Sequence, residues 1–211
     1  MNLESQCEKI GVDLKEIELD YSARPEDATL EYFKKQGFVG SSNEGITVQT
    51  VLKALMLDKL AEVNTFQDRS DACCRYLEAQ FTTHKDISRE IISTIKDVSP
   101  KSFKKNIREI LSQSFISSEY PELSEEVCIA LFEAIDVEVF ISLAERFSED
   151  SYNYRSGWPD LTLVRGKEVR FVEVKTHNKQ LKPTSTTLLV LCFFATLVQN
   201  NQLRSGSLAG R

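Results

Sequence analysis

Two short β-prone runs separated by a tight turn constrain the fold of this chain more than any other feature. Branched and aromatic residues dominate residues 161–164 (LTLV) and 169–172 (VRFV). The turn between them contains Gly166, at the position where a two-residue type II′ turn favours glycine. Antiparallel pairing about this turn places Asp160 opposite Glu173. The sequence therefore predicts a β-hairpin that brings two carboxylates together.

The predicted hairpin gathers charged groups on one of its faces. Side chains alternate along a strand, so Glu173 and Lys175 share one face while Val172 and Val174 point to the other. Two neighbouring carboxylates are costly unless a cation lies between them, and Mg²⁺ or Mn²⁺ would supply that cation. We expect Asp160, Glu173 and the Val174 carbonyl to hold the ion, and Lys175 to position the attacking water. This chemistry predicts phosphodiester hydrolysis.

The residues around the hairpin resemble a nuclease family. Residues 155–161 (RSGWPDL) and 171–175 (FVEVK) are similar to the PD-(D/E)xK nuclease superfamily and, in their fuller context, to its VRR-NUC branch. The resemblance implies an α/β (α+β) fold with a restriction-endonuclease-like core, and a catalytic set of Asp160, Glu173 and Lys175. The alternative is an ordinary surface hairpin whose acids are solvated.

An upstream glutamate, Glu44, has two explanations. It precedes a run of apolar residues at helical spacing from Val48 to Leu60, and an acid at a helix start is favoured by the helix dipole. Residues 43–47 (NEGIT) also resemble the G-E-G-x-[ST] helix of the Fanconi-associated nucleases, the eukaryotic VRR-NUC proteins. In that family this glutamate is the remaining metal ligand, which would add Glu44 to Asp160, Glu173 and the Val174 carbonyl.

The region from 66 to about 150 is predicted to be a helical insertion that separates Glu44 from the hairpin. Ser99, followed by a proline, and Ser124 are expected to cap helix starts. A loop is expected over 148–153, before the hairpin motif begins.

The helix that follows Ser99 carries a basic face. Acids are scarce between residues 99 and 111, so this face is either solvated or in contact with phosphates. Arg155 lies just before the hairpin, while Tyr152, Tyr154 and Trp158 either stack on a splayed base or cover the sheet. The candidate DNA-contacting residues are Lys101, Lys104, Lys105, Arg108 and Arg155.

Composition narrows the class of protein. At 211 residues and 41% apolar content, the chain suits one globular domain or a domain with an extension. Its net charge of −6 argues against nucleic-acid binding through a bulk positive field, so DNA contact requires a local basic patch. Five cysteines without a C-x-x-C pair indicate free thiols in a reducing compartment. Residues 1–11 do not resemble a signal peptide.

The C-terminal part of the chain departs from the family pattern. No Asp or Glu occurs from 176 to 211, and the glutamine-bearing helix of the family is not recognisable. The apolar run 188–198 is too short to span a bilayer, and we expect it to serve as a substitute strand or helix. Residues 199–211 are expected to be disordered. The predicted organisation is therefore a nuclease domain over 1–181 and an atypical tail over 182–211.

The resemblance also implies a biological role. It implies 5′-flap endonuclease and 5′-to-3′ exonuclease activity on branched or flapped DNA, in interstrand-crosslink repair in the nucleus. Repair proteins are then the expected partners, and no membrane is involved. The alternative is a catalytically impaired nuclease-like fragment that binds DNA or a protein.

Overall fold

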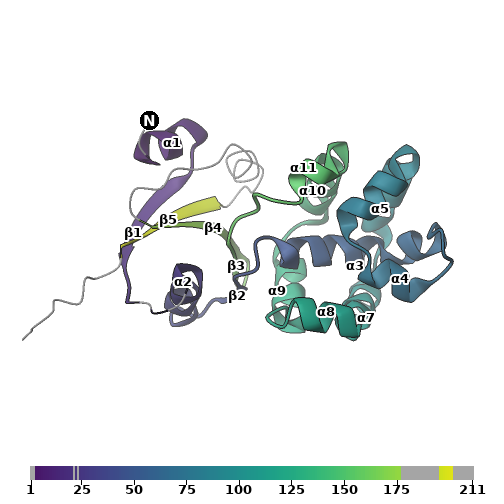
Figure 1. Ribbon diagram of the computed structural model, residues 1–211, viewed down its shortest axis with the longest axis horizontal. Helices are drawn as coiled ribbons and strands as arrows, with labels where there is room; N and C mark the ends of the chain where they lie inside the picture. Colours follow the sequence, from purple (N-terminus) through teal and green to yellow (C-terminus); the bar gives the residue numbers. More distant parts are fainter. Residues whose placement is uncertain (1–2, 21, 23, 177–194, 202–211) are drawn as a thin grey trace, which may run out of the picture.

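The fold is a mixed one, with a small sheet at one end and a helical lobe at the other. A computed structural model describes residues 3–20, 22, 24–176 and 195–201. Figure 1 shows the strands with α1 and α2 on the left, and the remaining helices gathered on the right. The predicted class, an α+β core with a large helical part, is confirmed.

Five strands form one sheet in the order β1-β5-β4-β3-β2. β3 pairs antiparallel with both β4 and β2, whereas β5 pairs parallel with β4 and β1. The strands are β1 (Asp13–Glu18), β2 (Val39–Ser41), β3 (Leu161–Arg165), β4 (Glu168–Thr176) and β5 (Ala195–Asn201). The strand that carries the predicted site, β4, is therefore flanked on both sides.

The helices fall into two groups. Near the sheet lie α1 (Leu3–Ile10) and α2 (Pro25–Lys34). The helical lobe contains α3 (Ile46–Glu62), α4 (Arg69–Cys74), α5 (Leu77–Thr83), α6 (Ser88–Ser93), α7 (Pro100–Leu111), α8 (Ser114–Glu119), α9 (Glu125–Ala134), α10 (Val137–Glu149) and α11 (Ser151–Tyr154), with two 3₁₀ turns at Lys85–Ile87 and Thr94–Asp97. Twelve of the 17 residues of α3 are buried, because α3 is apolar on most of its surface and lies at the centre of the lobe.

Both faces of the sheet are covered. On one face, Val172 and Val174 of β4 pack in a cluster with Leu30 and Phe33 of α2. On the other face, Phe171 belongs to the large core of the helical lobe. Because side chains alternate along β4, Glu173 and Lys175 lie on the same face as Phe171, toward the helical lobe.

Several local predictions are confirmed. Ser99 caps α7 by accepting a hydrogen bond from the Ser102 backbone N–H at 3.1 Å. Ser124 caps α9 by accepting one from the Val127 backbone N–H at 3.3 Å. The predicted core-packed helix through Val48 to Leu60 is α3.

Other predictions are wrong. The expected loop over 148–153 is instead the end of α10 and most of α11, and Asp150 caps α11 by accepting a hydrogen bond from the Asn153 backbone N–H. Residues 199–201 were expected to be disordered, but they lie in β5, where all three pair with β1 and the first two also pair with β4. The rest of the predicted tail, 177–194 and 202–211, lies outside the described residues.

Helix α3, at 17 residues, shows no stretch suited to crossing a bilayer, and the same holds for every other helix in the described part of the chain.

Candidate metal and catalytic site

The hairpin has the predicted register. Arg165 pairs with Glu168, and Leu161 pairs with Val172, so Asp160 follows directly opposite Glu173. Gly166 has φ +61, which is the positive value that the first residue of a type II′ turn requires. The turn therefore fixes which carboxylates meet at the far end.

The predicted donor groups converge on one position. The Lys175 ammonium group lies 2.5 Å from Glu173 Oε1, 3.1 Å from the Val174 carbonyl oxygen and 3.9 Å from Asp160 Oδ2. The Val174 backbone N–H donates a hydrogen bond of 2.6 Å to Asp160 Oδ2, which holds that carboxylate against β4. Oxygens of Asp160, Glu173 and Val174 therefore surround a single cation position, which the Lys175 ammonium group occupies.

Burial strengthens the electrostatic interactions among these charged side chains. The side chain of Glu173 is 4% exposed and that of Asp160 is 13% exposed. Burial, followed by the nearby charge of Glu173, raises the pKa of Asp160 from 3.8 to about 7, and its hydrogen bond from Val174 and the charge of Lys175 act in the opposite direction. The charge of Lys175 is therefore not enough to balance two carboxylates that lie close together in a buried place.

The donor set fits a divalent cation. Glu173 Oε2 is buried and has no hydrogen-bond partner among the described residues, although a buried carboxylate oxygen normally has one. Carboxylate and carbonyl oxygens are the ligands that Mg²⁺ and Mn²⁺ prefer. Asp160, Glu173 and the Val174 carbonyl would hold such an ion, which would also supply the missing positive charge.

The backbone of Glu44 lies next to this site. Its N–H contacts the Asp160 carbonyl oxygen at 3.4 Å, and its φ of +45 is unusual for a residue other than glycine. Gly45 follows with φ +81, and a Cβ at this position would lie 2.3 Å from the Trp158 side chain. The close contact of Gly45 with Trp158, whose indole N–H donates to the Tyr154 carbonyl at 2.7 Å, thus holds the start of α3 beside Asp160.

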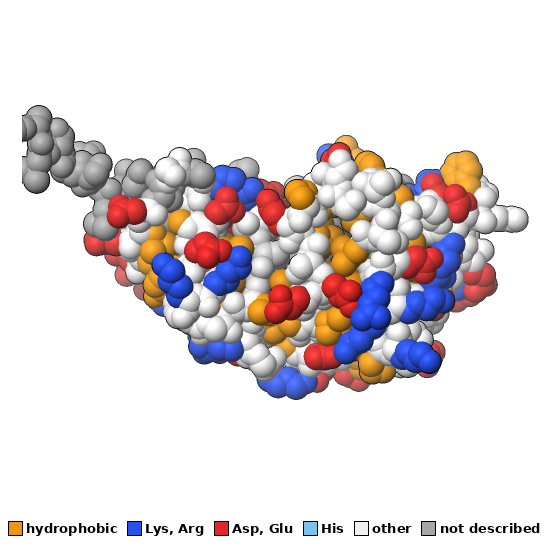
Figure 2. Space-filling model, turned by 90° about the horizontal axis from the view of Figure 1, so that it is seen from below, with side chains coloured by type: hydrophobic (Ala, Val, Ile, Leu, Met, Phe, Trp, Pro, Cys, Tyr) orange, Lys and Arg blue, Asp and Glu red, His pale blue; other side chains and the backbone are white. Residues whose placement is uncertain are grey.

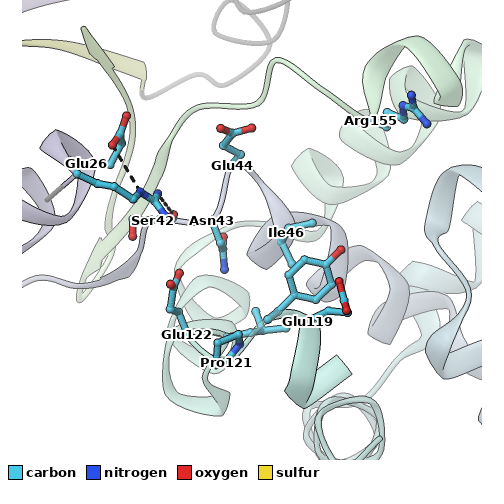
Figure 3. A pocket seen from close by; sticks show the side chains of 12 residues that line it. Glu26, Ser42, Asn43, Glu44, Ile46, Glu119, Pro121, Glu122 and Arg155 are labelled. Carbon is cyan, nitrogen blue, oxygen red and sulfur yellow. Dashed lines mark hydrogen bonds and ion pairs between the residues drawn. The ribbon is translucent and has the colours of Figure 1, made fainter. Parts of the chain in front are cut away.

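The Glu44 carboxylate itself is exposed and is not gathered with the other two. No group of three or more His, Cys, Asp or Glu side chains in the described chain is placed to hold a metal ion. Glu44 instead lines a pocket of about 470 Å³ between α2, the start of α3 and the segment before α9, together with Glu26 and Arg155 (Figure 3). Its role as a ligand stays a prediction.

Glu26 is a site-proximal acid that the sequence reasoning missed. It lies in the first turn of α2, lines the same pocket as Glu44, and its charge contributes to the raised pKa of Asp160. In the sequence it follows Pro25, where the helix dipole already explains an acid, so no separate signal marked it.

The predicted basic face on α7 is partly neutralised. Lys104 forms an ion pair with Glu133 at 2.9 Å and Arg108 forms one with Glu125 at 2.8 Å. Both acids belong to α9. The sequence argument considered only the acids between residues 99 and 111, so it did not include them. Lys101 and Lys105 are exposed. In Figure 2, red side chains lie among blue ones on the face drawn, so this face carries no broad positive surface.

The aromatic residues near the motif divide into two kinds. Trp158 is 2% exposed and packs beside Phe147 in the large core, so it does not stack on a base. Tyr152 is 62% exposed, and the Arg155 guanidinium lies 4.1 Å from the centre of its ring. Arg155 and Tyr152 therefore form an accessible pair at the edge of the helical lobe.

Comparison with known proteins agrees with this geometry. The family model described as VRR-NUC domain matches residues 98–192. The chain is 27% identical over 197 residues to the Fanconi-associated nuclease 1 homolog of Caenorhabditis briggsae, a match that covers 86% of this chain and 22% of that protein. This chain thus spans about a fifth of the length of its curated relative.

Two crystal structures are similar over most of the chain. They are paFAN1 bound to DNA with a 2-nt 5′ flap and a gap, with a TM-score of 0.68, and paFAN1 bound to DNA with a 1-nt 5′ flap and a gap, with a TM-score of 0.65. Each is 18% identical and covers 91% of this chain and 38% of the crystallised one. Residues 98–192 of this chain are therefore similar to the VRR-NUC domain, and its fold is similar to that of the paFAN1 structures.

Proposed function

We propose that this chain is a metal-dependent DNA nuclease that hydrolyses phosphodiester bonds in branched DNA, with 5′ flaps as its substrate. The observation that carries the proposal is the convergence of oxygens from Asp160, Glu173 and Val174 on one cation position. The VRR-NUC match supports DNA cleavage, and the flapped DNA in the paFAN1 crystal structures supports the choice of substrate.

The residues of the site have separate tasks. Asp160, Glu173 and the Val174 carbonyl would hold Mg²⁺ or Mn²⁺, which when bound would neutralise charge that develops on the phosphoryl oxygens. The Val174 N–H keeps Asp160 oriented toward that position. With a metal ion at the position that the Lys175 ammonium group occupies, that group would lie beside the ion and would donate a hydrogen bond to the attacking water. Glu44 is proposed as a further ligand because its backbone adjoins Asp160.

The wider role rests on the resemblance and on the curated relative. We propose 5′-flap endonuclease and 5′-to-3′ exonuclease action from this one site, in interstrand-crosslink repair in the nucleus, with repair proteins as partners. Lys101, Lys105 and Arg155 are the proposed phosphate contacts, since they are exposed. Lys104 and Arg108 would first have to leave their partners on α9.

A cleavage assay tests the proposal. Labelled 5′-flap, duplex and single-stranded DNA are incubated with the full chain in Mg²⁺, in Mn²⁺ and in EDTA. We expect metal-dependent cleavage near the flap junction, and a loss of about 10²–10³-fold in rate for Lys175→Met, because that change removes the hydrogen-bond donor that positions the attacking water. Glu173→Gln should abolish cleavage.

A matched control lies on the same strand. Glu168→Gln makes the same chemical change as Glu173→Gln, but Glu168 pairs with Arg165 and Arg170 at the hairpin tip, away from the site. It should retain activity. If the wild-type chain binds flapped DNA in a gel-shift assay yet cleaves nothing in either metal, the nuclease proposal fails and a binding module is favoured.

A further inference from the structure

The short helix α11 presents an exposed aromatic ring near the pocket that contains Glu44. Tyr152 of this helix is 62% exposed. The Arg155 guanidinium lies over the Tyr152 ring, 4.1 Å from its centre. Arg155 also lines the pocket together with Glu44, and in Figure 3 Glu44 lies between Glu26 on one side and Arg155 on the other. The ring and its guanidinium therefore stand at the rim of the proposed nuclease site.

Both ends of α11 are tied to the rest of the fold. Ser151 is 6% exposed, and its hydroxyl donates a hydrogen bond of 3.1 Å to the Glu78 carbonyl. The Tyr154 carbonyl accepts the indole N–H of the buried Trp158 at 2.7 Å. Tyr152 lies between these two anchors, so little backbone freedom is lost when a ligand binds to its ring.

The charges around this ring fit a nucleic-acid ligand. Arg155 is exposed and forms no ion pair within the described residues, whereas several other arginines of the helical lobe pair with acids. The acids just before the ring are already engaged. Asp150 accepts a hydrogen bond of 2.7 Å from the Asn153 side chain, and Glu149 pairs with Arg146. A guanidinium group stacked on a ring still has N–H groups at its edge for a phosphate.

The position of Arg155 in the chain limits which nucleotide reaches it. Arg155 precedes Asp160 by five residues. A residue spans at most ~3.6 Å, so the two Cα atoms lie within about 18 Å of each other. Successive phosphates of one strand are ~3.4 Å apart along a B-form duplex. A phosphate at Arg155 therefore lies within about five nucleotides of the one being cleaved.

We propose that Tyr152, with Arg155 over its ring, stacks on one unpaired base of the single-stranded flap, within about five nucleotides of the cleaved phosphate. The inference rests on the proposed function for its choice of a flapped substrate. Every base has a π-face, so such stacking is tolerant of sequence. In an intact duplex both faces of a base are covered by its neighbours. Tyr152 thus contributes to a preference for flapped DNA over duplex.

Binding of flapped DNA in EDTA tests this contact without any cleavage. A 2-aminopurine base is placed in turn at each of the five flap positions nearest the junction, and its fluorescence is followed as the full chain is added. We expect binding to quench the fluorescence at one position, where the ring stacks on the base. The quenching should disappear in Tyr152→Ala and remain in Tyr152→Phe, because phenylalanine keeps the ring.

Affinities from fluorescence anisotropy give the size of the effect. Tyr152→Ala should weaken the binding of flapped DNA roughly 5–100-fold and leave the binding of blunt duplex unchanged. An abasic nucleotide at the quenched position should weaken binding by the wild type to the same extent. The same abasic nucleotide should have no further effect on Tyr152→Ala, because the stacking contact is already lost.

Phe66→Ala is the matched control. Phe66 is 66% exposed, and the Arg75 guanidinium lies 5.0 Å from the centre of its ring, so the pair resembles that of Tyr152 and Arg155. Phe66 follows the C-terminal end of α3, whereas Glu44 precedes its start, and a helix of 17 residues is about 25 Å long. Phe66→Ala should therefore bind flapped DNA as the wild type does.

Three results would overturn the stacking contact. They are the absence of position-specific quenching in the wild type, an abasic nucleotide that weakens wild type and Tyr152→Ala equally, and a wild type that does not bind flapped DNA. Cleavage is a separate measurement. If the chain cleaves flaps but Tyr152→Ala binds them as the wild type does, the stacking contact is refuted and the nuclease proposal stands. Tyr152-dependent binding without cleavage in either metal would do the reverse.

Discussion

The raised pKa of Asp160 makes a prediction about the metal-free protein. Because burial and the charge of Glu173 disfavour the ionised carboxylate, replacing it by a neutral amide should stabilise the fold. We predict that Asp160→Asn increases the free energy of unfolding in EDTA at pH 8. The amide oxygen can still accept the hydrogen bond from the Val174 N–H, so that contact is kept.

The magnitude follows from the pKa. Each pKa unit corresponds to ~1.36 kcal/mol. A rise in the pKa of Asp160 from 3.8 to about 7 therefore sets a ceiling of ~4 kcal/mol. The loss of the 3.9 Å contact with Lys175 and any residual structure in the unfolded chain reduce this value, so we expect ~1–3 kcal/mol.

The pH dependence has a definite sign. The folded protein binds the Asp160 proton more tightly than the unfolded chain does, so the stability contributed by protonation is fully present below pH 3.8 and is lost as pH rises to about 7. The advantage of the Asn variant should therefore be largest above pH 7 and should shrink as pH falls from 7 toward 4.

Urea unfolding of wild type and variant, followed by circular dichroism from pH 4 to pH 8, measures this difference. Other titrating groups are common to both proteins, so their contributions cancel in the difference between the two free energies of unfolding. An Asn variant that is less stable than wild type at pH 8 would show that the Lys175 attraction outweighs burial, and would refute this account of the site.

Three further predictions concern the surroundings of the site. Gly45→Ala should lower the free energy of unfolding by ~2–4 kcal/mol in urea titrations, because its Cβ would meet Trp158 at 2.3 Å in a positive-φ conformation; an unchanged midpoint would contradict the close packing. The double change of Lys101 and Lys105 to Ala should weaken DNA binding and reduce the slope of log affinity against log salt by about 2, as measured by fluorescence anisotropy; an unchanged slope would exclude both as phosphate contacts. Asn106→Ala should cost ~1–3 kcal/mol in thermal unfolding, because the Asn106 amide is 1% exposed and donates to a backbone carbonyl of α3 at 2.9 Å; a change below measurement error would refute this contribution.

Local sequence signals predicted the hairpin and several helix starts because each depends on a few neighbouring residues. The turn at Gly166 fixed the register that brings Asp160 to Glu173, and Ser99 and Ser124 cap helices as expected. These features follow from backbone geometry over a few residues, and the identities of those residues are enough to predict it.

The rest of the site depends on contacts between distant parts of the chain. Strand β1 was missed because its residues are mostly charged, and it is held by pairing with β5 almost two hundred residues later. The acids that neutralise Lys104 and Arg108 come from another helix. Likewise, the contact of Gly45 with Trp158 joins two distant parts of the chain, so it has no local sequence signal.

Binding of Mn²⁺ to the site is the most direct test of the central claim, that Asp160, Glu173 and the Val174 carbonyl form a divalent-cation site. Isothermal titration calorimetry at pH 8, where Asp160 is ionised, compares wild type with Glu173→Gln and with the control Glu168→Gln. We predict saturable Mn²⁺ binding for wild type and for the control, and none for Glu173→Gln. Equal binding by all three proteins, or no binding by wild type, would contradict the claim.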